Sequence, residues 1–85
     1  MKVFVLNYLS DPADDMSTSD VLGVYKTKEE AQKEMKKSFM NKVLDLGIEE
    51  DEVNGFEVKF CETDDEYSIY HYGSFYKWRI YDSEI

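Results

Sequence analysis

The chain contains a single histidine and a single cysteine, and these are the side chains best suited to acid–base or nucleophilic chemistry. His71 would act as a general base only with a carboxylate or Cys61 as its partner. It lies in an alternating apolar stretch, so we interpret it as a hydrogen-bonded, partly buried imidazole with a structural role. Cys61 lies on the polar side of a predicted strand with no histidine near it in sequence, which indicates a free thiol without special reactivity. We therefore predict no catalytic residues, and a small enzyme centred on His71 is the alternative.

Acidic residues are the other groups that could do chemistry, because carboxylates bind divalent cations. They cluster at residues 11–20, 49–52 and 64–66. None of these segments has the alternating acids, central glycine and closing glutamate of an EF-hand loop, and the chain has no glycine-rich loop that would hold a phosphate. We therefore interpret the clusters as solvated loop charge and predict no metal and no cofactor.

The charge of the chain limits its partners. Nineteen acidic and ten basic residues give a formal net charge of -9, which repels phosphate backbones and anionic membrane surfaces. Residues 28–44 differ, because their five lysines and three glutamates give a local balance of +2. The sequence thus predicts no direct binding of nucleic acid or membrane, and a charge asymmetry that would orient a basic protein partner.

Length and composition bound the architecture. Eighty-five residues form one small domain, residues 1–85, and 42% hydrophobic residues are enough for a packed interior. A single cysteine fits a reducing compartment. The N-terminal stretch MKVFVLNYLSDP is too short and too quickly acidic for a signal peptide or a membrane span, so we expect a cytoplasmic protein.

Two short apolar stretches open the chain. Residues 2–9 carry apolar side chains on both faces, which predicts an interior strand that is covered or partly covered on both sides. Residues 10–19 collect the only proline with three aspartates and three serines, a composition typical of a loop. Residues 21–25 are rich in β-formers and would pair antiparallel with the first strand.

A helix is predicted over residues 28–46. Thr27 and Glu30 predict a reciprocal capping box at its start, and Gly47 predicts a left-handed end. At about 100° per residue, one stripe faces the sheet. This stripe comprises Ala31, Met35, Phe39, Val43 and Leu46. Met40 and Leu44 lie outside it beside several lysines, where either lysine stems cover them or a partner contacts them.

The second half of the chain predicts three further strands. Residues 56–61 alternate around Phe56, Val58 and Phe60 after the turn signal at residues 54–55. The stretch 67–81 predicts a hairpin with Gly73–Ser74 as its two-residue loop, which sets Tyr72 opposite Phe75. One hairpin face, directed to the helix, comprises Tyr67, Ile69, His71, Tyr76, Trp78 and Ile80.

The other hairpin face is the predicted aromatic surface, and it comprises Tyr70, Tyr72, Phe75 and Tyr81 with Lys77 and Arg79 beside them. A single helix on the opposite side leaves this face toward solvent, unless segment 10–19 or segment 48–54 folds over it. Exposed tyrosines beside an arginine are typical of the residues that dominate binding at protein interfaces.

The segment VLGVYKTKEEAQKEM joins the second strand to the helix through Gly-Val-Tyr and Thr-Lys-Glu-Glu-Ala. It resembles a loose group of small uncharacterised bacterial and phage proteins that share a hydrophobic–Gly–Val–Phe/Tyr–Ser/Thr–x–Glu–x–Ala segment between a strand and a helix. The resemblance covers residues 2 to 46. It implies a small accessory protein and carries no catalytic residue to this chain.

These elements predict an α+β fold of two layers, with one helix packed on a mainly antiparallel sheet in the order ββαβββ. We predict a non-enzymatic protein-interaction module, a bacterial or phage accessory or inhibitor protein whose acidic surface binds a basic partner. A nucleic-acid-handling protein is one such partner, because spaced carboxylates can occupy a groove that binds phosphates. The alternative is a self-associating structural protein, a homodimer through the aromatic hairpin face. The predicted interaction residues are Tyr70, Tyr72, Phe75, Tyr81, Glu49, Glu50, Asp51, Glu52, Asp64, Asp65 and Glu66.

Overall fold

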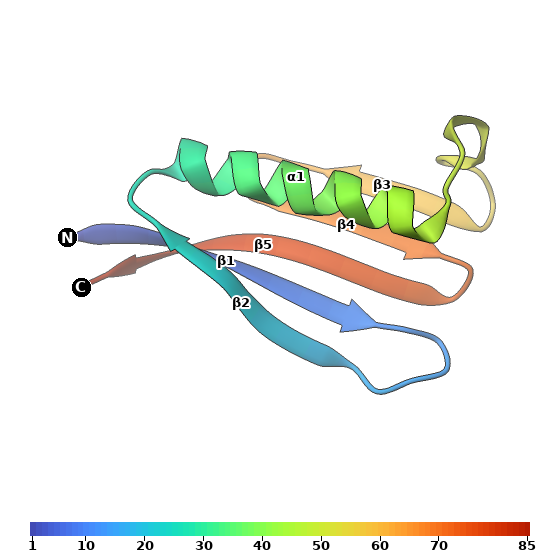
Figure 1. Ribbon diagram of the computed structural model, residues 1–85, viewed down its shortest axis with the longest axis horizontal. Coiled ribbons are helices and arrows are strands. Elements are labelled where there is room, and N and C mark those ends of the chain that lie inside the picture. The colour runs from blue at the N-terminus through green and yellow to red at the C-terminus, as the bar shows by residue number, and fades with distance from the viewer.

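Alternating apolar residues build five antiparallel strands in this chain, and one amphipathic segment builds a helix that packs on them. Figure 1 shows the computed structural model, which describes residues 1–85. The elements in chain order are β1 (Lys2–Asp11), β2 (Thr18–Tyr25), α1 (Lys28–Leu46), the 3-10 turn η1 (Glu50–Glu52), β3 (Val58–Glu62), β4 (Glu66–His71) and β5 (Ser74–Glu84). The predicted α+β class and the order ββαβββ are confirmed.

The strands lie in the order β2-β1-β5-β4-β3, so β1 and β5 are central and β2 and β3 form the two edges. β1 and β5 pair from Lys2 opposite Glu84 to Asp11 opposite Phe75. The interior position predicted for the first strand and its antiparallel pairing with the second are confirmed. No helix in the structure combines the length and the apolar character that crossing a membrane requires.

The first hairpin is longer than its sequence predicts. β1 continues to Asp11 and β2 begins at Thr18, so the loop spans residues 12–17 instead of 10–19. The ladder continues through Leu9 opposite Ser19 and Ser10 opposite Thr18, because serine and threonine fit an extended backbone as well as a loop. The pairing register shifts between Leu6 and Asn7, where a bulge leaves Leu22 without an opposite residue.

The helix follows its local signals. The Thr27 hydroxyl accepts a hydrogen bond from the Glu30 amide at 3.2 Å, and Gly47 adopts a left-handed φ of 66°. The Ile48 amide then donates to the Val43 carbonyl at 3.2 Å, which closes the helix end. The helix bounds 28–46 are therefore confirmed, while the reciprocal bond from Thr27 N–H to the Glu30 side chain does not form.

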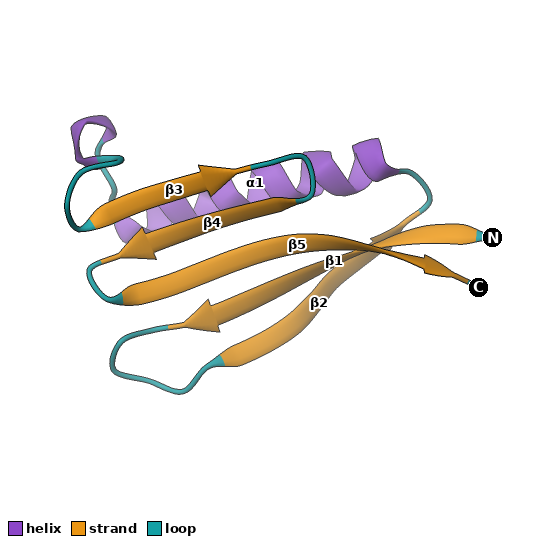
Figure 2. Cartoon of the chain, turned by 180° about the vertical axis from the view of Figure 1, so that it is seen from behind, coloured by secondary structure: helices purple, strands orange, loops and turns teal.

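The core lies between α1 and one face of the sheet. Ala31, Met35 and Phe39 of the predicted stripe are buried, and Val43 and Leu46 are partly buried beside them. The Phe39 ring packs edge-on against three aromatic rings of the sheet, at centroid distances between 5.0 and 5.7 Å. From behind, the strands lie in front of the helix and no element covers them (Figure 2). The first strand is nevertheless covered or partly covered on both faces, as predicted, since Val3 on the open face is buried and Val5 is half-buried.

The hairpin of β4 and β5 keeps its predicted faces but not its predicted pairs. Its two-residue loop is Tyr72–Gly73, with positive φ angles of 46° and 88°, and this sets Tyr70 opposite Phe75. The predicted Gly73–Ser74 loop is therefore wrong. The strand residues on both sides of the turn still point to their predicted faces, because the register shifts by two residues and side chains alternate with a period of two. Ile69, Tyr76, Trp78 and Ile80 are buried under the helix, as expected.

The third predicted strand begins later than expected. β3 starts at Val58, which pairs with His71, the last residue of β4. Phe56 has no opposite strand residue and is 90% exposed, so its predicted burial is wrong. Asn54, with a left-handed φ of 63°, turns the chain before β3.

Candidate interaction surfaces

His71 and Cys61 lie on opposite faces of the sheet. His71 is half-buried on the helix side, and its ring packs edge-on against Tyr72 at 4.8 Å. Cys61 is exposed on the other side, opposite Ser68. His71 makes no hydrogen bond or ion pair with a carboxylate, and no group of histidine, cysteine and acidic side chains is arranged to hold a metal ion.

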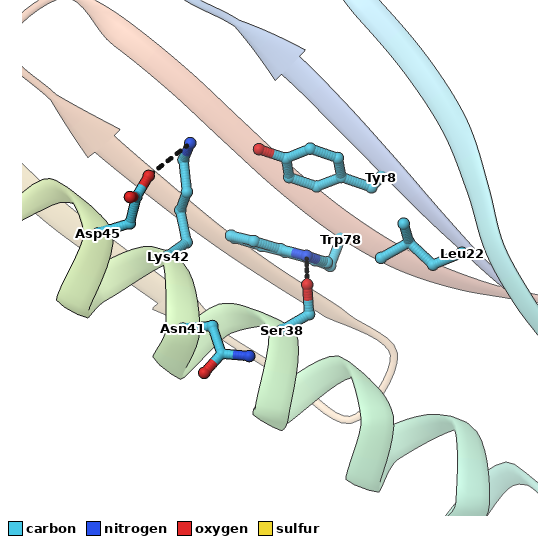
Figure 3. Close-up of a pocket in the computed structure, with 7 residues that line it drawn as sticks. All are labelled: Tyr8, Leu22, Ser38, Asn41, Lys42, Asp45 and Trp78. Carbon is cyan, nitrogen blue, oxygen red and sulfur yellow. Dashed lines mark hydrogen bonds and ion pairs between the residues drawn. The ribbon is translucent and has the colours of Figure 1, made fainter.

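A shallow groove of about 390 Å³ lies between α1 and strands β1 and β2. Figure 3 shows its lining, with Tyr8, Trp78 and Leu22 on the sheet side and the helix residues Ser38, Asn41, Lys42 and Asp45 on the other. The rings of Tyr8 and Trp78 are tilted together at 5.0 Å.

The polar groups of the groove are already engaged with each other. Trp78 Nε1 donates to Ser38 Oγ at 2.8 Å, and Lys42 pairs with Asp45 at 3.7 Å. The Lys42 ammonium also lies 4.4 Å from the centroid of the Tyr76 ring. Ser38 and Lys42, two groups of the groove that could do nucleophilic or base chemistry, thus both have partners within the fold.

The uncovered face of the sheet carries the aromatic surface. Tyr70 and Tyr81 are 37% and 47% exposed on this face, and Phe75 is partly buried beside Tyr70. Arg79 lies over the Tyr81 ring at 5.3 Å. Neither segment 10–19 nor segment 48–54 covers this face, because both lie at one end of the sheet (Figures 1 and 2). These three predicted residues therefore lie on one open face, where Phe75 is beside Tyr70 and Tyr81 lies towards the other end of β5.

Tyr72 is not part of that surface. It lies in the left-handed turn after β4, and its hydroxyl donates to Glu52 Oε2 at 3.0 Å. This bond ties the β4–β5 turn to η1. It also sets the pKa of both groups: hydrogen bonds from the Glu49 amide and from Tyr72 lower the pKa of Glu52, and the carboxylate raises the pKa of Tyr72.

Acidic residues gather at one end of the sheet. The end of β1, the β1–β2 loop, the end of α1, η1 and the β4–β5 turn all lie there, whereas both chain termini lie at the other end (Figure 1). The Ala13 amide donates to Ser74 Oγ at 3.0 Å, which joins the loop to the turn. We call this region the acidic end; its acids are Asp11, Asp14, Asp15, Asp45, Glu49, Glu50, Asp51, Glu52 and Glu57.

The other predicted acids lie elsewhere. Asp64 and Asp65 form the β3–β4 turn at the opposite end of the sheet, so the structure does not bring them to Glu49–Glu52. Glu66 is not a free acid, because it pairs with Arg79 at 3.0 Å and with Lys77 at 3.8 Å on the open face. Its negative charge is therefore partly neutralised by neighbouring side chains of the sheet.

Sequence analysis missed Asp45 and Glu57 as members of the acidic end. The topology would have indicated them. Because successive elements run in opposite directions, every second connection lies at the same end of the sheet. On the outer side of the helix, Met40 and Leu44 are 47% and 76% exposed, so lysine stems leave much of both side chains uncovered.

Comparison of the chain with known protein families, with curated proteins and with solved structures gives no significant match to any of them. Its function is therefore inferred from its own surfaces.

Proposed function

We propose that this protein is a non-enzymatic interaction module whose acidic end binds a basic protein partner. The observation that carries the proposal is the position of nine carboxylates at the end of the sheet where α1 also ends. The last turn of α1 contains no basic residue. The partial negative charge of the helix C-terminus therefore adds to the charge of the acids, because no basic side chain in the last turn neutralises it.

This arrangement of acids lowers the stability of the isolated protein and favours its association with a positively charged partner. Like charges that lie close together repel, and a concentrated negative field accelerates the approach of a positively charged protein. A basic surface that docks here would neutralise both the carboxylates and the helix end. A protein that handles nucleic acid fits this description, since its phosphate-binding groove carries the required positive charge.

The remaining features fit an accessory role. In a two-layer arrangement of helix and sheet, the acidic end is a rim that stays clear of the core, so a partner can contact it without disturbing the fold. We further propose a cytoplasmic location and an origin among bacterial or phage accessory proteins, on the single cysteine and the strand-to-helix segment described above.

The test compares charge reversals at the two ends of the sheet. Glu49→Lys, Glu50→Lys and Asp51→Lys together reverse the acidic end and leave Glu52 bonded to Tyr72. Asp64→Lys with Asp65→Lys reverses charge at the opposite end and serves as the control. Tagged proteins are used to capture partners from a bacterial lysate at about 50 and 150 mM salt, a range over which charge-driven binding weakens strongly.

We expect basic proteins to bind the wild type and the control, more weakly at the higher salt, and to be lost with the triple variant. Capture that is equal for both variants, or equal at both salt concentrations, would contradict the proposal.

Self-association through the aromatic surface is a second candidate, favoured by the exposure of Tyr70 and Tyr81 on an uncovered sheet face. Light scattering at micromolar concentration tests it with Tyr70→Ser combined with Phe75→Ser. A wild type that is monomeric, with a mass unchanged in this variant, removes the candidate.

A further inference from the structure

The two edges of the sheet are protected unequally. At the β3 edge the strand has only five residues, two of them charged, and the Asn54 side chain accepts a hydrogen bond from the Phe60 amide at 3.5 Å. That bond occupies a backbone donor that points away from β4, since β4 is the only neighbour of β3 in the sheet. Short length, charge and an occupied backbone are the features by which proteins prevent edge pairing.

The β2 edge has fewer of these features, which are the single charged residue Asp20 and the bulge at Leu22. It is eight residues long, contains neither lysine nor proline, and has Asp20 as its only charged residue. Val21, Leu22 and Val24 are 62%, 43% and 59% exposed along it. The only side-chain hydrogen bond to this strand comes from Asn7 of β1, which lies on its paired side. An apolar edge strand of this kind is a template for a further strand.

We propose that the β2 edge binds the β2 edge of a second copy of this chain, antiparallel and around a two-fold axis, so that two sheets join into one continuous sheet. The register that uses the full length of β2 pairs Thr18 with Tyr25 of the second copy. In this register Asp20 lies opposite Gly23 of the second copy, and the bulges at Leu22 of both copies lie at the two-fold axis, where Val21 and Leu22 of the two strands meet. No two like charges are opposed.

A second copy fits this edge better than an unrelated strand for two reasons. First, the apolar residues Val21 and Leu22 lie at the centre of the eight residues and the hydroxyl residues lie at an end, so the symmetric pair has an apolar centre and a polar rim. Second, β2 is preceded by Asp14 and Asp15 and followed by Lys26 and Lys28, before the acidic first turn of α1 begins. Antiparallel pairing sets the acidic flank of each copy beside the basic flank of the other, whereas parallel pairing would oppose like charges.

The size of the edge sets the expected strength. Eight paired residues at about 3.3 Å each extend roughly 26 Å, and only one strand of each copy takes part in the contact. This contact is smaller than the roughly 800 Å² per partner of a standard interface, so the dimer should dissociate on dilution. Of the acidic end, only Asp14 and Asp15 lie at the dimer contact, and the carboxylates at the end of α1 and in η1 remain available to another partner.

The test is sedimentation equilibrium of the full chain over a wide concentration range. The edge variant combines Val21→Lys with Val24→Lys. The control combines Met40→Lys with Leu44→Lys, which adds the same charge at similarly exposed apolar residues on the outer side of α1. We expect a concentration-dependent dimer for the wild type and the control, and a dimerisation constant weakened about tenfold or more in the edge variant, because four lysines then meet across the edge.

Hydrogen exchange of the wild type provides a readout that needs no variant. Amides of β2 should exchange more slowly as protein concentration rises, while those of β3 should not change. A wild type that is monomeric throughout, β2 exchange that is independent of concentration, or a dimer that survives in the edge variant would overturn the proposal. A dimer lost with Tyr70→Ser and Phe75→Ser but kept in the edge variant would assign association to the aromatic surface instead.

Discussion

Replacing Asp45 by asparagine should stabilise the protein, although it removes an ion pair. Asp45 lies in the last turn of α1, where a negative charge is disfavoured by the helix dipole by about 0.3–1 kcal/mol. Its pair with Lys42 spans 3.7 Å at helix positions i and i+3, and the Asp45 side chain is 74% exposed. Such pairs contribute only about 0.2–0.5 kcal/mol. Lys42 also keeps its position over the Tyr76 ring without Asp45.

The dipole term therefore exceeds the ion-pair term, and removal of one charge from the acidic end adds to the gain. We expect the free energy of unfolding to rise by about 0.5 kcal/mol at low salt, or roughly 2–4 °C in melting temperature for a chain of this size. The assay is urea unfolding followed by circular dichroism, where the midpoint shifts and the slope stays constant.

A matched variant at the other helix end gives the opposite sign. Glu29 lies in the first turn, where its charge is favourable, so Glu29→Gln should lower the stability by about 0.3–1 kcal/mol. Both effects should shrink in about 0.5 M salt because exposed charges are screened. A loss of stability in Asp45→Asn at low salt, or shifts that ignore salt, would refute the reasoning.

Three further outcomes are expected. Ser38→Ala leaves Trp78 Nε1–H without its acceptor and should cost about 1–3 kcal/mol by urea unfolding, whereas Asn41→Ala on the same groove should cost much less. Phe39→Ala should cost about 3–5 kcal/mol, enough to unfold much of the protein at 37 °C, and a folded variant with an unchanged melting temperature would show that the aromatic cluster is not the core. Tyr72→Phe should be less stable than the wild type only at intermediate pH. The lowered pKa of Glu52 gives a contribution to stability that is complete above its ordinary pKa of 4.5 and is lost as the pH falls through the lower pKa of the folded state. The raised pKa of Tyr72 gives a contribution to stability that is complete below pH 10.0 and is lost as the pH rises through the higher pKa of the folded state. The two unfolding curves should therefore converge at both extremes, and a constant difference at all pH values would contradict the bond.

Local signals were sufficient to predict the helix. Thr27, Gly47 and the spacing of Ala31, Met35 and Phe39 each act within a few residues, and no distant contact overrides them. The faces of the last hairpin were also predictable, because strand side chains alternate whatever the register.

The hairpin register depended on a distant contact. A left-handed φ is unusual for a large side chain, so Tyr72 is a poor turn residue by local preference. In the structure its hydroxyl reaches Glu52, and the shifted register sets Ile69 opposite Tyr76 in the core. The contact with Glu52 lies outside residues 67–81, so that stretch alone does not reveal it.

The acidic end likewise required the topology. Residues 11–15, 45–57 and the turn at 72–73 are far apart in sequence and meet because β1, α1 and β4 all end on the same side. Asp64 and Asp65 were grouped with Glu49–Glu52 by composition, but the length of β3 separates the two sets.

The pairing of β1 with β5 has a practical consequence for building with this protein. The Ile85 amide donates to the Met1 carbonyl at 2.8 Å, so residues 1 and 85 are neighbours on the side remote from Glu49–Glu52. A fluorescent protein or affinity handle fused at either residue would emerge away from the carboxylates. A short linker between residues 1 and 85, with the chain opened inside the 12–17 loop, should give a circular permutant that keeps every strand pair, since tolerated openings lie at such exposed loops.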